Sequence, residues 1–110
     1  MSITLKRGDT WPPLVVSVSD DNGAIDLTTA SEIRLLLKSS SYTLETDPVS
    51  PSDAGSGEIT YDWQVGDTDN SGTYQLEVEI VWATGQIQTV PNDGYGEVKI
   101  IDDLGGVSPA

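Results

Sequence analysis

The chain contains neither cysteine nor histidine among its 110 residues. Without cysteine it can form neither a disulfide framework nor a thiolate metal site. Without histidine it lacks the side chain used most often as a general base and as a metal ligand. Its many serine and threonine hydroxyls therefore have no histidine partner to activate them as nucleophiles. We expect that the protein is not an enzyme and carries no cofactor.

Positive charge is also scarce. Five lysines and arginines face 18 aspartates and glutamates, which gives a net charge of −13. Nucleic acids and anionic membranes are bound by basic surfaces, so we expect neither as a partner. A charge of this size destabilises the compact state unless salt screens it. It indicates either a protein from a high-salt, halophilic organism or an acidic surface that prevents self-association.

Long apolar runs are missing as well. No segment approaches the roughly 20 apolar residues of a membrane-spanning helix. Residues 2–7 have a polar and basic character that lacks the apolar centre of a signal peptide. We expect the protein to leave the cell only inside a larger particle or by lysis.

Apolar and polar residues alternate with a period of two along most of the chain, which predicts half-buried β-strands. The clearest alternation covers residues 73–82, and similar segments are expected at residues 3–5, 14–19, 33–38, 42–46, 58–63, 86–90 and 95–101. Turn signals separate them, and residues 47–57 are expected to form a long loop. This spacing predicts an all-β protein, an immunoglobulin-like antiparallel β-sandwich of about seven to eight strands. The domain would span residues 1–103, followed by a tail at residues 104–110.

An acidic segment at residues 67–72 matches the first six positions of an EF-hand calcium loop. Asp67, Asp69 and Ser71 are thus weak candidates for metal ligands. The twelfth position is Val78 instead of glutamate, and the flanking segments have the pattern of strands. We expect no metal there, and a turn in which Gly72 adopts a positive φ.

The three tryptophans have different expected places. Trp63 and Trp82 are in phase with the apolar faces of their strands, so we expect both in the core. Trp11 lies outside any clear strand, beside Pro12 and Pro13. It is either a partner contact or a plug of the core. If the three tryptophans instead formed a stacking platform for sugars, the protein would be a carbohydrate-binding or adhesion module.

Several segments together resemble a known family. They are, in chain order, residues 5–14 (LKRGDTWPPL), 21–28 (DNGAIDLT), 30–35 (ASEIRL), 71–78 (SGTYQLEV) and 88–91 (QTVP). Their order is similar to that of the N-terminal domain of tailed-phage baseplate upper proteins and of related small tail and virion modules. The family pattern has a GDT opening, a G…DLT turn, a G-x-Y-x-L-E-V strand and a Pro-x-x-Gly turn before the last strand. The resemblance covers roughly residues 5–103.

The resemblance implies an immunoglobulin-like sandwich located in the virion and attached to other virion proteins. In that family the domain usually precedes a long fibre or receptor-binding region, and the sequence here ends at Ala110 without one. We therefore expect a baseplate or tail adaptor in a homo-oligomer or another symmetric assembly. A capsid decoration (cement) protein is the alternative. The expected partner contacts are Trp11, Pro12, Pro13, Pro48, Pro51, Gly105 and Val107.

The charge yields the first testable prediction. If the acid excess is an adaptation to high salt, the melting temperature should rise steeply as sodium chloride is raised from millimolar to molar concentrations, because added salt screens the repulsion. Differential scanning calorimetry over that range measures the effect. A melting temperature that does not depend on salt would contradict the high-salt interpretation.

Overall fold

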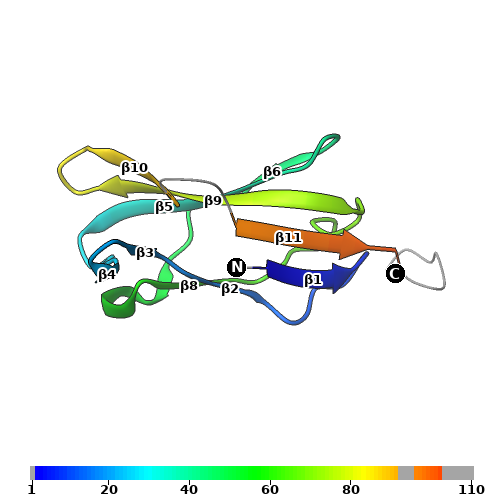
Figure 1. Cartoon of the computed structure of the whole chain (residues 1–110), viewed down its shortest axis with the longest axis horizontal. Helices are drawn as coiled ribbons and strands as arrows, with labels where there is room; N and C mark the ends of the chain where they lie inside the picture. The colour runs from blue at the N-terminus through cyan, green and yellow to red at the C-terminus, as the bar shows by residue number, and fades with distance from the viewer. Residues whose placement is uncertain (1, 92–95, 103–110) are drawn as a thin grey trace.

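Strands make up nearly all of the regular structure. The computed structural model describes residues 2–91 and 96–102, and in these residues it contains strands β1 to β11 and one 3₁₀ turn, η1 (Figure 1). The all-β class predicted from the period-two pattern is confirmed. The strands are more numerous than expected because several are only two or three residues long. No helix in the described residues has the length and hydrophobicity needed to cross a membrane.

The larger sheet has β9 at its centre. Its strand order is β1 (Ser2–Lys6), β11 (Gly96–Ile101), β9 (Gly72–Trp82), β5 (Ala30–Lys38) and β6 (Thr43–Glu45), and β10 (Ile87–Val90) also pairs with β9. β10 and β11 lie end to end along the same edge of β9. β1 runs parallel to β11, so the sheet is mixed. This pair corrects the expectation of antiparallel strands throughout, because a chain pattern of alternating residues carries no information on strand direction.

The smaller sheet has the order β2 (Leu14–Ser17), β8 (Glu58–Tyr61) and β7 (Pro51–Asp53), and β3 (Ser19–Asp20) and β4 (Gly23–Ala24) form a separate hairpin. β7 and η1 (Ala54–Ser56) lie inside the segment that we expected to be a long loop. Gly57 closes this segment with a φ of +73°, and a Cβ there would lie 2.7 Å from two backbone carbonyl oxygens. Only glycine fits that position.

The two sheets share one core. Buried side chains of β2 and β8 (Leu14, Val16 and Ile59) form a single cluster with those of β5, β9 and β11. Burial alternates along β5 and β9 as the sequence predicts. The structure is therefore a two-layered, sandwich-like arrangement of sheets. The buried hydrophobic residues are Leu5, Leu14, Val16, Val18, Ile25, Leu27, Ile33, Leu35, Leu37, Ile59, Trp63, Tyr74, Leu76, Val78, Ile80, Val90, Val98 and Ile100.

Tyr74 ties the start of β9 to the preceding loop. Its side chain is buried, and its hydroxyl donates a hydrogen bond to the backbone carbonyl of Asn70 at 2.6 Å. Its ring also packs edge-on against Tyr42, with ring centroids 6.3 Å apart. Burial raises the pKa of the Tyr74 hydroxyl. This side chain thus links the central strand to the loop before it and to Tyr42.

We predict that Tyr74→Phe lowers the free energy of unfolding by about 1–2 kcal/mol, because the variant loses this hydrogen bond and keeps the ring. Urea denaturation followed by tryptophan fluorescence measures the change. Tyr42→Phe is the matched control, since the Tyr42 hydroxyl donates no hydrogen bond within residues 2–91 and 96–102. Equal losses in the two variants would contradict the role assigned to Tyr74.

Candidate partner-contact surface

Two loops lie side by side at one end of the molecule. The first, residues 7–13, joins β1 to β2, and the second, residues 62–71, joins β8 to β9. Thr68 connects them: its hydroxyl donates to the carbonyl of Asp9 at 2.8 Å, and its carbonyl accepts the Gly8 N–H at 3.0 Å. Thr68 is almost completely buried, at 1 % exposed. The backbone of the first loop is therefore anchored on the second.

These loops carry the two most exposed large hydrophobic side chains in the described residues. Trp11 is 76 % exposed and Val65 is 85 % exposed. Pro12 is exposed and Pro13 is half-buried. We refer to Trp11, Pro12, Pro13 and Val65 as the Trp11 surface. The exposure of Trp11 rules out the alternative in which it plugs the core.

The other tryptophans do not join this surface. Trp63 is buried in the core, as predicted, and Trp82 is half-buried and packs against the core from the opposite end of β9. A stacking platform made of all three tryptophans is therefore not formed. Trp11 is the most exposed of the three.

A carboxylate braces the second loop from inside. Oδ2 of Asp67 accepts hydrogen bonds from the Tyr61 hydroxyl at 2.5 Å and from the Gln64 N–H at 2.8 Å. The Tyr61 ring packs edge-on against Trp63, with centroids 5.6 Å apart. Burial, followed by the hydrogen bond to Asp67, raises the pKa of Tyr61 above its ordinary range. The part of the loop that presents Val65 is thus held by Asp67 against the end of β8.

The same contacts locate the metal-ligand candidates. Asp67 faces Tyr61 and Gln64, whereas Asp69 and Ser71 are exposed. No group of three or more acidic side chains that could hold a metal ion occurs in the part of the chain that the structure describes. Metal binding by this loop stays a weak prediction. Gly72 adopts a φ of +154°, which confirms the positive φ expected there.

The remaining contact candidates lie elsewhere. Pro48 is exposed, and Pro51 is half-buried at the start of β7. β7 is separated from β2, the strand that follows Trp11, by the width of β8. Pro51 therefore belongs to the opposite edge of the smaller sheet. Pro48 lies beside β5 of the larger sheet, because the N–H groups of Thr46 and Val49 donate to the carbonyls of Leu35 and Ile33. Gly105 and Val107 lie outside the described residues.

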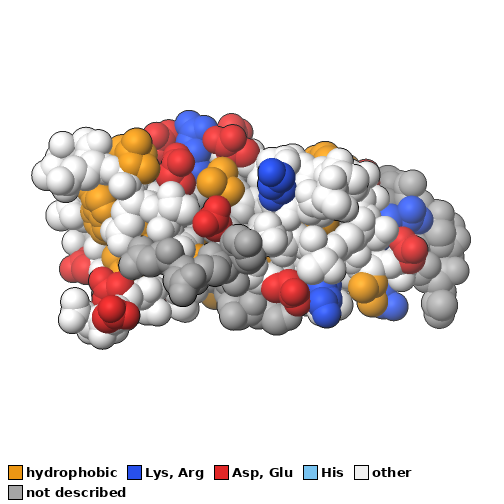
Figure 2. Space-filling view, turned by 45° about the horizontal axis from the view of Figure 1, so that its top comes forward, with side chains coloured by type: hydrophobic (Ala, Val, Ile, Leu, Met, Phe, Trp, Pro, Cys, Tyr) orange, Lys and Arg blue, Asp and Glu red, His pale blue; other side chains and the backbone are white. Residues whose placement is uncertain are grey.

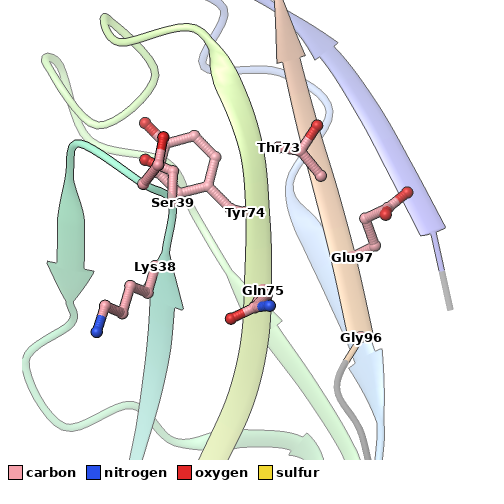
Figure 3. Close-up of a pocket in the computed structure, with 8 residues that line it drawn as sticks. Lys38, Ser39, Thr73, Tyr74, Gln75, Gly96 and Glu97 are labelled. Carbon is pink, nitrogen blue, oxygen red and sulfur yellow. The ribbon is translucent and has the colours of Figure 1, made fainter.

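A polar recess of about 490 Å³ crosses β5, β9 and β11. Figure 3 shows Lys38 and Glu97 on opposite sides of β9, with Gln75 between them. Glu97 also pairs with Lys99 at 3.7 Å. The recess offers hydrogen-bonding groups and both signs of charge, and no nucleophile paired with a base. It is lined by Lys38, Ser39, Ser40, Thr73, Tyr74, Gln75, Gly96 and Glu97.

Basic side chains on the face in Figure 2 are dispersed among acidic ones. On the larger sheet, Arg34 forms ion pairs with Glu32 at 2.9 Å and with Glu45 at 3.3 Å. The hydrogen bond to Glu32 raises the pKa of the Arg34 guanidinium. These partly exposed pairs neutralise charge locally and contribute little to stability.

Comparison with known proteins assigns no family. No protein-family model matches the chain, and no curated protein matches it in sequence. The function of the Trp11 surface must therefore be argued from its geometry and from the residues that form it.

Tyr61 yields a pH-dependent prediction. Its pKa is raised on folding, so the neutral hydroxyl contributes stability below the ordinary tyrosine pKa of about 10, and this contribution is lost as the pH rises further. We expect the free energy of unfolding to fall above about pH 10, and to fall less steeply in Tyr61→Phe. Urea denaturation at pH values from 8 to about 11.5 measures both slopes. Parallel pH profiles for the two proteins would show that Tyr61 is not the group responsible.

Proposed function

We propose that the protein is a structural virion component of a tailed virus, and that it attaches to neighbouring subunits through the Trp11 surface as a baseplate or tail adaptor. The observation that carries this proposal is the 76 % exposure of Trp11 on a loop whose backbone Thr68 anchors. Tryptophan is among the residues that contribute most to protein–protein binding when buried in an interface. A loop that is ordered before binding loses less entropy on binding.

We also propose that the sandwich is immunoglobulin-like. The strand order β11-β9-β5-β6 corresponds to strands G, F, C and C′ of that fold, and β2-β8-β7 corresponds to B, E and D. In this alignment β10 and β11 together take the place of strand G. The hydrogen bond from Tyr74 to the carbonyl four residues upstream, near the start of β9, matches the tyrosine corner of strand F.

The location of the family-like segments supports the virion role. The GDT opening, residues 8–10, leads directly into Trp11, and its Gly8 and Asp9 are the residues that Thr68 holds. The G-x-Y-x-L-E-V segment, residues 72–78, is the first part of β9 and contains Tyr74. Two of the five segments that carry the resemblance, residues 5–14 and 71–78, therefore lie at the end of the molecule that presents Trp11. The other three, residues 21–28, 30–35 and 88–91, contain β4, the start of β5 and the end of β10.

We predict that Trp11→Ala reduces incorporation of the protein into virus particles at least about tenfold, because the anchor of the contact is lost. Its free energy of unfolding should change by less than about 0.5 kcal/mol, since the side chain is exposed. Quantitative mass spectrometry of purified particles, relative to the major capsid protein, measures incorporation. Thr84→Ala is the control, because Thr84 is exposed in the hairpin at the opposite end of β9. Normal incorporation of Trp11→Ala would remove this surface from the proposal.

The copy number of the unmodified protein in the same particles separates the possible locations. A small number that matches the symmetry of the tail supports the adaptor role. A number close to that of the capsid subunit indicates a decoration protein instead. Absence from the particles would overturn the virion proposal and make glycan binding by Trp11 the next function to test.

A further inference from the structure

The outer edge of β10 has no strand beside it in the described part of the chain. β10 pairs with β9 on one side, from Ile87 opposite Val81 to Val90 opposite Val78. The neighbouring stretch of edge, along β11, is covered by β1, but β1 begins with Ser2 opposite Glu97 and does not extend to β10. Among the described residues, the sheet therefore ends at β10, and no strand pairs with its outer edge. Figure 1 shows β10 beside β9 at one end of the larger sheet.

The hydrogen-bond pattern shows which backbone groups this edge offers. The N–H of Trp82 donates to the carbonyl of Gln86 at 2.8 Å. Trp82 and Gln86 are opposite each other, one position before the pair Val81 and Ile87, so they continue the register of β9 and β10. In an antiparallel pair, residues that face the partner strand alternate with residues whose N–H and C=O both point away. Gln88 and Val90 therefore bond to β9, whereas Ile87 and Thr89 direct their backbone groups outward.

This edge lacks the charges that usually prevent sheets from joining. Residues 83–91 include no charged side chain in a chain that has 23 of them, and Ile87 is 66 % exposed. By contrast, β1 carries Lys6, β6 carries Glu45 and β7 carries Asp53. Lysine and other charges on edge strands are the usual protection against edge-to-edge pairing. β2 is also uncharged, but Pro12 and Pro13 directly precede it.

We propose that two copies of the chain pair antiparallel through β10, with Ile87 of each protomer opposite Thr89 of its partner. In this register the outward N–H and C=O groups of both residues find partners, and the two copies are related by a two-fold axis. Gln88 lies on that axis opposite its own copy. Because β10 carries no charged side chain, a second copy that approaches along it meets little repulsion from the acidic side chains of this strand.

The contact is small, so the dimer is weak. A strand of four residues covers much less area than the roughly 1,200–2,000 Å² of a standard stable interface. Each copy also carries a charge of −13, which opposes association until salt screens it. We therefore expect dimerisation to increase with salt and with protein concentration. This pairing of free copies in solution does not depend on the virion role proposed above.

A single introduced cysteine tests the register, because the natural chain has none. Gln88→Cys places two sulfur atoms across a non-hydrogen-bonded pair, where the Cα atoms are about 4.5 Å apart and within disulfide range. In molar sodium chloride and under mild oxidation, this variant should form disulfide-linked dimers at least about tenfold faster than Thr89→Cys. The Thr89→Cys control lies on the same strand, and in this register its partner residue is Ile87, not itself.

Two further variants test the edge itself. Ile87→Lys, added to Gln88→Cys, should slow cross-linking about tenfold, because it puts one charge per copy on the contact. Val15→Lys, also added to Gln88→Cys, is the control. It places the same charge on the β2 edge and should leave the cross-linking rate unchanged. Sedimentation velocity of the unmodified protein measures the dimer directly. Equal cross-linking rates for Gln88→Cys and Thr89→Cys, or a monomer at millimolar concentration in molar salt, would overturn the proposal. In the second case the edge would be open only to a strand from a different protein.

Discussion

The structure depends on the burial of one face of β9. This strand pairs with β5 along one edge and with β10 and β11 along the other, so most of the larger sheet is organised around it. Tyr74, Leu76, Val78 and Ile80 point to the core and are each at most 2 % exposed. Since side chains alternate across a strand, a shift of one residue would place polar residues in the core and these four in water. Burial of this face therefore fixes the register of every strand that pairs with β9.

The Trp11 surface rests on a few buried polar contacts beside that core. Thr68 is 1 % exposed, yet its side chain and its backbone both have partners, in the loop at residues 7–13. A buried hydroxyl without a partner would cost free energy, so these bonds hold the loop in one position. Asp67 acts similarly on the second loop through Tyr61 and Gln64. An exposed tryptophan can therefore be presented by an ordered backbone, although nothing packs over its ring.

The predictable part of the fold is the part that hydrophobic periodicity describes. The alternation along residues 73–82 located β9 and its buried face correctly because one side of that strand is core. The parallel pairing of β1 with β11 and the short strand β7 carry no such signal: the first depends on contacts distant in sequence, and the second is half-exposed and begins with proline. Thr68 was missed for a related reason. In the sequence, a threonine in a polar loop looks the same whether its hydroxyl faces water or another loop. The segment drew attention only because Thr68 stands between the aspartates of a turn.

The two proposed contact regions are centred on Trp11 and on the β10 edge, and both of these lie in segments without charged residues. Uniform repulsion among surface acids would keep all copies of the chain apart, yet residues 83–91 contain no charge, and neither do residues 10–19, which include Trp11 and β2. Contacts between surfaces that carry like charge are favourable only where such charge is locally absent and apolar groups can be covered. Three of the five exposed large hydrophobic side chains in the described residues, Trp11, Val15 and Ile87, lie in these two uncharged segments, whereas Val65 and Ile101 lie near aspartates. Charge therefore selects which parts of an otherwise repulsive surface can be buried against another protein, and it selects the Trp11 loop and the β10 edge.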